Sequence, residues 1–263
     1  MSIHAKMDLF TSSFAATTLE QLNSKAAMMS RIDNKYIVEA ENLTKMVPQL
    51  SETFDILEIS DQRAFGYDTR YYDDLDRTTF HEHHQGRRQR MKVRARKYVG
   101  ADLCFLEVKV KGLRGMTEKH RIPYDINNFH ALTPEGVQFA QETYSRQYGT
   151  QFNFVLRPSL DVHYKRVTLV ARTGGERMTI DTDLRFQSEN CVSRTGTGVF
   201  ILETKSANGR GLADRILRAG GARRTNSCSK YCIGMAATGQ VRRYNRFLPA
   251  LRRLGLCVPN RRS

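Results

Sequence analysis

The stretch from Met91 to Lys111, MKVRARKYVGADLCFLEVKVK, contains two runs in which apolar and charged residues alternate. The apolar positions are Met91, Val93 and Ala95 in the first run and Leu106, Val108 and Val110 in the second. The charged positions are Lys92, Arg94, Arg96, Glu107, Lys109 and Lys111. Successive side chains of a β-strand point to opposite faces. The pattern therefore predicts two strands that each have an apolar face and a charged, mainly cationic face.

The same alternation recurs on both sides of this stretch. Further strands are predicted at 31–38, 54–59, 66–73 and 119–122, around 164–166, and at 177–184 and 201–205. Their polar faces carry Lys119, Arg121, Arg166, Arg177, Asp181, Asp183, Glu203 and Lys205. Helices are predicted at 17–27, 40–50, 134–148, 212–219 and 230–254, the last of them kinked or broken at Pro249. Short strands at hairpin spacing predict an antiparallel sheet, closed or nearly closed.

Length and composition are those of a globular protein. The 263 residues, 40% of them hydrophobic, suffice for one large β-rich domain or a tight pair. We predict an N-terminal helical segment at 1–29, a central domain at 30–239 and a basic helical tail at 240–263. No stretch approaches the roughly 18 apolar residues of a membrane span, and Met1 to Ser13 lacks the order of a signal peptide. We therefore expect a cytoplasmic protein.

The predicted polar faces carry a large excess of positive charge. They hold ten cations, namely Lys92, Arg94, Arg96, Lys109, Lys111, Lys119, Arg121, Arg166, Arg177 and Lys205. Four carboxylates oppose them, namely Glu107, Asp181, Asp183 and Glu203. An ordinary solvated sheet face explains any single strand, but such a face normally mixes signs because like charges on neighbouring strands repel. Taken together, the strands predict a partner with negative charge.

A curled sheet would place this charge inside. A barrel of about eight strands has room for side chains and one small ligand. Burying so many cations is costly unless a highly charged ligand neutralises them. Phosphate oxygens meet this need, because Arg offers a planar fork and Lys a compact point charge. The few carboxylates suit Mg²⁺ or Mn²⁺, since such ions are commonly held by one or two carboxylates and substrate phosphates.

Two other features have simpler interpretations. HEHH, from His81 to His84, would place His81 and His83 on one face of a strand, but no further Cys or His cluster completes a metal site, so we interpret it as a surface or edge strand. The five cysteines are scattered and are expected to be reduced thiols.

The basic C-terminal segment suggests a different function. The net charge is +15, and residues 240–263 hold seven arginines and no acid. A solvated helix end explains such a run, and binding to nucleic acid or to an anionic surface is the alternative. No zinc finger, helix-turn-helix or RNA-recognition aromatic pair accompanies the charge, so nucleic acid is disfavoured.

Eight short segments, taken in order, resemble VTC domains, the polyphosphate polymerase branch of the triphosphate tunnel metalloenzyme (CYTH-like) superfamily. They are RIDNKY at 31–36, KVRARKY at 92–98, FLEVKVK at 105–111, EKHR at 118–121, YKR at 164–166, ERMTIDTDL at 176–184, ILETK at 201–205 and SKY at 229–231. RIDNKY stands where other tunnel enzymes carry two alternating glutamates before the lysine, which favours the polymerase branch over adenylate cyclases and thiamine triphosphatases.

The resemblance implies an α+β fold, an eight-stranded antiparallel β-barrel tunnel with helices packed outside. It also implies an enzyme that uses Mn²⁺ or Mg²⁺ to transfer the γ-phosphate of a nucleoside triphosphate such as ATP to a growing inorganic polyphosphate chain, with release of the diphosphate. Unlike the eukaryotic complexes, the chain shows no SPX-type segment and no membrane segment. We therefore expect a cytoplasmic enzyme, peripheral at the inner membrane face if the basic tail binds an anionic membrane or a membrane protein.

Residue roles are carried over by motif. The implied phosphate-binding residues are Lys35, Arg94, Arg96, Lys109, Lys119, Arg166, Arg177 and Lys205. Of these, Arg94, Arg96 and Arg166 act with Lys230 on the transferred phosphate. Glu203 is the implied metal ligand, and Glu107 and Asp183 are further candidates by strand position.

The acceptor stays open at this stage. Phosphoryl transfer needs positioning and charge neutralisation more than a protein nucleophile, so the acceptor is phosphate or water. A tunnel-fold triphosphatase and a non-catalytic polyphosphate-binding domain are therefore the alternatives to a polymerase.

Overall fold

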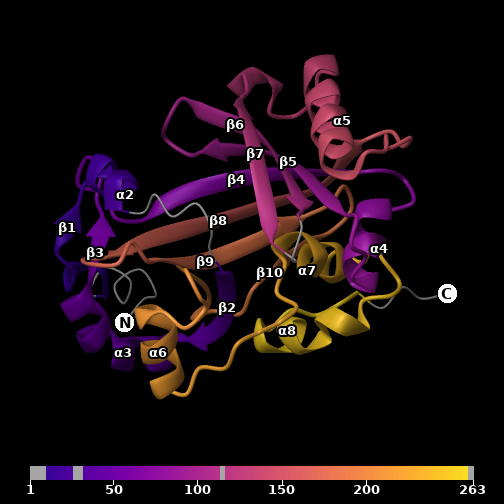
Figure 1. Cartoon of the computed structure of the whole chain (residues 1–263). Helices are drawn as coiled ribbons and strands as arrows, with labels where there is room; N and C mark the ends of the chain where they lie inside the picture. The colour runs from indigo at the N-terminus through magenta and orange to yellow at the C-terminus, as the bar shows by residue number, and fades with distance from the viewer. Residues whose placement is uncertain (1–9, 26–31, 113–115, 260–263) are drawn as a thin grey trace.

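A computed structural model describes residues 10–25, 32–112 and 116–259, and in it a single eleven-stranded sheet is surrounded by helices (Figure 1). Eight strands form an antiparallel path in the order β2-β11-β9-β8-β4-β5-β6-β7. Their bounds are β2 Ile32–Glu39, β4 Phe65–Asp73, β5 Met91–Tyr98, β6 Leu103–Lys111, β7 Thr117–Pro123, β8 Arg157–Ala171, β9 Arg177–Gln187 and β11 Val199–Ser206. Three short strands extend the sheet, namely β1 Ala16–Thr17, β3 Phe54–Leu57 and β10 Val192–Arg194.

The helices agree with several of the predicted ones. The α-helices are α2 Leu19–Lys25, α3 Ala40–Thr53, α4 Thr78–Gln85, α5 Pro134–Tyr148, α6 Leu212–Ala219, α7 Lys230–Ala237 and α8 Leu248–Arg253, with short 3₁₀ turns η2 Ile126–Asn128 and η3 Asn245–Phe247. The predictions at 134–148 and 212–219 are confirmed at both ends. Of the predicted N-terminal segment, residues 1–9 and 26–29 lie outside the described residues.

The sheet curls so that strands far apart in its order approach each other. β2 is the first strand of the path, and β6 and β7 are the last two. Asp33 and Lys35 of β2 nevertheless line the same cavity as Lys109 and Lys111 of β6. Within the described residues no ladder of hydrogen bonds joins β2 to β7. The predicted tunnel of eight antiparallel strands is therefore confirmed. Its two ends approach each other without pairing through backbone hydrogen bonds among the described residues.

Apolar outer faces carry the helices, as the alternation predicts. The outer residues Val93 and Leu106 pack with Ala140 and Tyr144 of α5 in one buried cluster. A second cluster joins α3 and α6 to β2, β9 and β11. Figure 1 shows α3 and α6 together on one side and α4, α7 and α8 together on another. The charged faces are thereby left for the interior.

Helix α7 covers the apolar end of the interior face. Its residues cluster with Val162 and Phe186, and Gly234 allows this close approach, since a Cβ there would lie 2.5 Å from both Leu160 Cδ2 and Phe186 Cδ1. This docking places Lys230, the first residue of α7, beside the charged part of the interior.

The prediction of a strand at HEHH is wrong, because these residues lie in α4. The preceding residues Asp73 and Asp74 accept hydrogen bonds from the backbone N–H groups of Thr78, Thr79 and Phe80. Carboxylates that satisfy these otherwise unpaired donors favour helix initiation. His83 is thereby carried on a helix at the edge of the tunnel.

The C-terminal helix prediction is also corrected. Helix α7 ends at Ala237, before Gly239 with its positive φ of 69°, and Pro249 lies in the first turn of α8, where the absence of an N–H is tolerated. Phe247, Leu251 and Leu254 are buried in the cluster that contains α7. The described part of the basic segment therefore packs on the tunnel, while Arg261 and Arg262 lie outside the described residues.

Asp214 holds α6 against the sheet. Its Oδ1 accepts hydrogen bonds from Tyr36 Oη at 2.7 Å, Asn34 Nδ2 at 2.7 Å and Thr204 Oγ1 at 2.8 Å. Burial would raise the pKa of Asp214, but the bonds from Tyr36 and Asn34 hold it below its usual value. The ionised carboxylate is thus the form that stabilises the fold.

We expect Asp214→Asn to lower the free energy of unfolding by about 2 kcal/mol, because the amide cannot accept all of these bonds. A depressed pKa means that the stabilisation is present above the unfolded-state pKa and is lost as the pH falls through the folded value. The difference from the parent should therefore shrink below about pH 4. Urea unfolding at several pH values measures it, with the exposed Asp102→Asn as control. Equal stability of parent and Asp214→Asn at neutral pH would contradict this role.

Candidate functional site

Two arginines meet a buried carboxylate on one wall of the tunnel. Arg94 Nε lies 2.7 Å from Glu107 Oε2, and Arg96 Nη1 lies 3.7 Å from the same oxygen. Lys119 Nζ lies 3.5 Å from Oε1. Burial would raise the pKa of Glu107, but Arg94 and Arg96 hold it far below its usual value. Glu107 is therefore an ionised group that keeps the arginines in position.

A second group of charged side chains comes from β8, β9 and α7. Arg166 forms a fork with Asp181, with its Nε 2.6 Å from Oδ1 and its Nη2 2.8 Å from Oδ2. Lys230 from α7 contacts the same carboxylate. Burial raises the pKa of Asp181, but Arg166 and Lys230 outweigh it and lower the value to about 2. Three sequence segments thus bring one anion and two cations together.

Glu203 has a different environment, because its ion-pair partners in the described part of the chain are lysines. Lys205 contacts Glu203 Oε1, and Lys35 Nζ lies 3.7 Å from Oε2. Lys205 Nζ is also 3.3 Å from Asp33 Oδ2, so two carboxylates share one ammonium group. Burial would raise the pKa of Glu203, but Lys205 and Lys35 hold it well below its usual value.

Tyrosine rings support the arginines from the side. Tyr67 and Tyr164 stack with their centroids 5.3 Å apart, and Arg166 Cζ lies 5.3 Å from each centroid. Arg96 Cζ lies 5.6 Å from the Tyr67 centroid. Cation–π contacts of this kind orient a guanidinium while leaving its N–H groups free for an anion.

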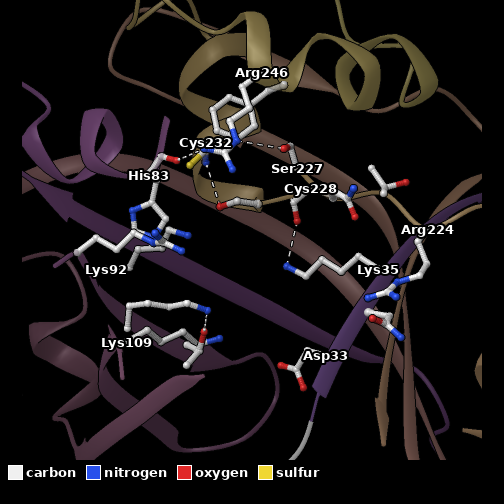
Figure 2. Close-up of a pocket in the computed structure, with 18 of the residues that line it drawn as sticks. Asp33, Lys35, His83, Lys92, Lys109, Arg224, Ser227, Cys228, Cys232 and Arg246 are labelled. Carbon is white, nitrogen blue, oxygen red and sulfur yellow. Dashed lines mark hydrogen bonds between the residues drawn. The ribbon is translucent and has the colours of Figure 1, made fainter. Parts of the chain in front are cut away.

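A cavity of about 320 Å³ opens at one mouth of this tunnel (Figure 2). Its lining includes a single described carboxylate, Asp33. The lining cations are Lys35, Arg90, Lys92, Lys109, Lys111, Arg224 and Arg246. Figure 2 shows Lys92 and Lys109 on one side of the cavity and Lys35 and Arg224 on the other. The walls thus converge on a small space with positive charge from several directions.

Lys92 and Lys109 are lining cations without an ion-pair partner among the described residues. They pair in register between β5 and β6, and neither ammonium group has an ion pair or hydrogen bond within the described residues. Burial lowers the pKa of Lys92 to about 8, and the nearby Lys35 adds to this. Arg94 and burial lower the pKa of Lys109. Such repulsion is relieved when an anion enters.

The sequence-predicted residues fall into two sets. The tunnel brings together Lys35, Arg94, Arg96, Glu107, Lys109, Lys119, Arg166, Glu203, Lys205 and Lys230. Arg177 lies at the α2 side, where its Nη2 is 3.5 Å from the Leu22 carbonyl oxygen.

Asp183 is exposed at a β-bulge, with φ at 54°. The expectation that it shares the face of Asp181 is therefore wrong, because the extra residue shifts the alternation.

The mouth contains residues that the motif analysis did not select. Lys92 and Lys111 belong to the predicted cationic faces but were not assigned as site residues. His83, Arg224 and Arg246 come from a helix, a loop and a 3₁₀ turn, where no period-2 pattern marks them. Only the tertiary arrangement brings these five to one cavity.

The carboxylates suit a divalent ion only in part. Within the described residues no group of three or more His, Cys, Asp or Glu side chains could enclose a metal. Asp33 and Glu203 contact the same ammonium group, and two carboxylates with substrate phosphates are a common Mg²⁺ environment. Glu107 fits less well, since arginines and a lysine occupy its oxygens.

A family model described as VTC domain matches residues 30–238. Among solved structures, a proposed adenylate cyclase from Bacillus halodurans is similar, with a TM-score of 0.51 and 13% identity, over 76% of this chain and 95% of that one. A proposed adenylyl cyclase from Hippeastrum, described with a dominant triphosphatase activity, gives a TM-score of 0.48 and 14% identity, over 79% and 96%. No curated protein matches the chain. The likeness to the Bacillus protein supports the fold.

Removing one unneutralised cation should have opposite effects on stability and binding. We expect Lys92→Met to raise the free energy of unfolding of the ligand-free protein by about 1 kcal/mol, because it removes a buried charge whose pKa is depressed. The same change should weaken tripolyphosphate binding about tenfold, through loss of a charge-assisted bond.

Urea unfolding and calorimetric titration measure these two effects, and Lys45→Met on the exposed face of α3 is the control. Calorimetry in two buffers above pH 8 should also show that the parent takes up protons on binding, and that Lys92→Met takes up fewer. A variant with unchanged affinity would exclude Lys92 from the binding site.

Proposed function

Because the chain belongs to the VTC-domain family, we propose that it is a metal-dependent polyphosphate polymerase that transfers the γ-phosphate of a nucleoside triphosphate to inorganic polyphosphate. The family membership agrees with the resemblance found in the sequence motifs. The observation that carries the proposal is the set of cations around the mouth, which continues the charged tunnel interior and in which Lys92 and Lys109 have no ion-pair partner among the described residues. A chain of phosphates matches the sign of the charge on this lining.

The triphosphate would bind among the interior arginines. Arg94, Arg96 and Arg166 are already oriented by Glu107 and Asp181, so phosphate oxygens meet guanidinium groups that need little rearrangement. Preorganised charges of this kind stabilise the charge that develops during phosphoryl transfer. Lys230 shares Asp181 with Arg166 and, beside it, would contact the transferred phosphate.

Glu203, with Asp33, would hold Mn²⁺ or Mg²⁺. When bound, such an ion neutralises phosphate charge and polarises the phosphoryl group. Lys205 contacts both carboxylates, so it would turn to the phosphates once the ion is present. Arg177 and Lys119 would contact the ends of a longer chain, since they lie at the margins of the charged interior.

The alternatives differ in the acceptor. A triphosphatase would use water, and a binding domain would transfer nothing. The cations at the mouth favour a phosphate acceptor, because an open cationic cavity beyond the interior offers a place for a second anion. Inorganic polyphosphate and orthophosphate are therefore the acceptors that we propose.

Association with a membrane stays a prediction. Within the described residues no helix is long and apolar enough to cross a bilayer. Arg242, Arg243, Arg246, Arg252 and Arg253 of the basic segment are all exposed. Two of them also donate hydrogen bonds, Arg253 to the Ile37 carbonyl oxygen and Arg246 to that of His84. The exposed arginines would supply the attraction to an anionic surface, about 1 kcal/mol each near the bilayer.

Incubation of the purified chain with ATP and Mn²⁺ or Mg²⁺ tests the activity directly. We expect polyphosphate on gels and the nucleoside diphosphate as the second product. No synthesis is expected after a chelator has removed the metal. Orthophosphate as the only phosphate product would identify a triphosphatase. Binding of ATP and polyphosphate without turnover would identify a binding domain.

Glu203→Gln separates the metal from phosphate binding. The variant keeps the shape of the side chain but loses the charge that a divalent ion requires, so we expect turnover to fall at least 100-fold. Tripolyphosphate affinity without metal should change less than threefold, whereas Arg166→Ala should lose affinity itself. Turnover assays and metal-free titrations measure both, with the exposed Glu189→Gln as control. Equal losses of turnover and metal-free affinity in folded Glu203→Gln would contradict the assignment.

A further inference from the structure

His83 has an unused ring nitrogen at the cationic mouth. Its Nδ1 lies 2.8 Å from the Thr79 carbonyl oxygen, one turn earlier in α4. A carbonyl oxygen only accepts, so Nδ1 carries the hydrogen and Nε2 keeps its lone pair. Within the described residues Nε2 has no hydrogen-bond partner, and the side chain lines the 320 Å³ cavity. Figure 2 shows the His83 ring on the same side of the cavity as Lys92.

The surroundings keep this nitrogen unprotonated. Burial lowers the pKa of His83 well below its usual value, and Lys92 and Arg90 lower it further. The titratable and charged groups around the ring are Glu82 on α4, Arg90 just before β5, Lys92 on β5, Lys111 on β6, Cys232 on α7 and Arg246 on η3. An imidazole that is neutral at physiological pH in a cluster of cations serves as a hydrogen-bond acceptor and as a base.

A bare nitrogen in this cavity distinguishes among phosphate groups. Internal phosphates of a chain carry no hydrogen at neutral pH, so the cations bind them and Nε2 does not. Orthophosphate and the terminal phosphate of a chain carry a P–OH group near neutral pH. This group can donate a hydrogen bond to Nε2. The lysines at the mouth and His83 together therefore match a phosphate that still bears a hydrogen.

We propose that the mouth is the acceptor site and that His83 Nε2 accepts the P–OH proton of the acceptor phosphate as the new phosphoanhydride bond forms. This inference rests on the proposed polymerase function. It gives a chemical task to the HEHH segment, which the phosphate-binding and metal-binding residues leave unused.

The step balances as follows. The P–OH oxygen of the acceptor gives its proton to Nε2 and uses the electron pair that it retains to bond the γ-phosphorus. The bond between the γ-phosphorus and the β,γ-bridging oxygen breaks, and its electron pair leaves on the diphosphate end of the nucleotide. The imidazolium, surrounded by Lys92, Arg90 and Lys111, then releases its proton to solvent.

His84 provides a matched control on the same helix. Its Nε2 lies 2.7 Å from Asn245 Oδ1, it is not among the residues that line the cavity, and its side chain packs near Phe80 and Phe247. His84→Gln therefore changes a neighbouring histidine without changing the base.

Transfer to orthophosphate and to short polyphosphate should be measured for parent, His83→Gln and His84→Gln from acidic pH, below the lowered pKa of His83, to mildly alkaline pH. We expect the parent rate to rise with pH through an acid limb. His83→Gln should be about 100-fold slower at neutral pH and lack that limb, as loss of a general base predicts. His84→Gln should follow the parent. A folded His83→Gln with the parent rate and the parent pH profile would overturn the proposal.

If the parent forms no polymer, the polymerase function is refuted. A binding measurement still tests the site in that case. His83→Phe removes the acceptor nitrogen and keeps a ring of similar size. Its affinity for orthophosphate should fall about tenfold, while its affinity for trimetaphosphate, a cyclic anion without P–OH at neutral pH, should match that of the parent. Equal changes for the two anions, including no change for either, would overturn the assignment of His83 to the P–OH group.

Discussion

The structure depends on positive charge that the protein itself does not neutralise. The sheet turns its charged strand faces inward because its apolar faces are buried beneath α3, α5 and α6. Glu107 and Asp181 balance Arg94 and Arg166, but Lys92 and Lys109 are neighbours across a strand pair and neither has an ion-pair partner among the described residues. Leaving such charges together costs stability in the free protein. An anion that enters relieves this repulsion, so the free energy lost in the free protein is recovered as binding affinity.

This arrangement divides the interior into parts with different chemistry. Arginines held by carboxylates and by the rings of Tyr67 and Tyr164 form a fixed surface for phosphate oxygens. Around Glu203 the partners are lysines, whose flexible stems let them exchange one anion for another. A rigid arginine wall beside an exchangeable lysine–carboxylate cluster suits a reaction in which phosphates arrive, transfer and leave.

The alternation of residues predicted much of the fold and of the charged interior. Because a strand has period two, the inward positions of Arg94, Arg96, Glu107, Lys109 and Glu203 follow from sequence as soon as the strands are recognised. The rule fails where the backbone departs from that period. At Asp183 a bulge inserts a residue, and at His81–His84 the carboxylates of Asp73 and Asp74 start a helix. The cavity wall made by His83, Arg224 and Arg246 comes from segments without any periodic pattern, so only the packing of α4 and α7 on the tunnel brings it together.

A crystal structure with a non-hydrolysable triphosphate and Mn²⁺ would test the central claim most directly, with the anomalous signal of manganese to locate the metal. The account predicts phosphate oxygens within hydrogen-bonding distance of Arg94, Arg166 and Lys109, and manganese bound to Glu203. A triphosphate bound instead on the exposed arginines of the C-terminal segment, with the interior lysines still unpaired, would contradict it.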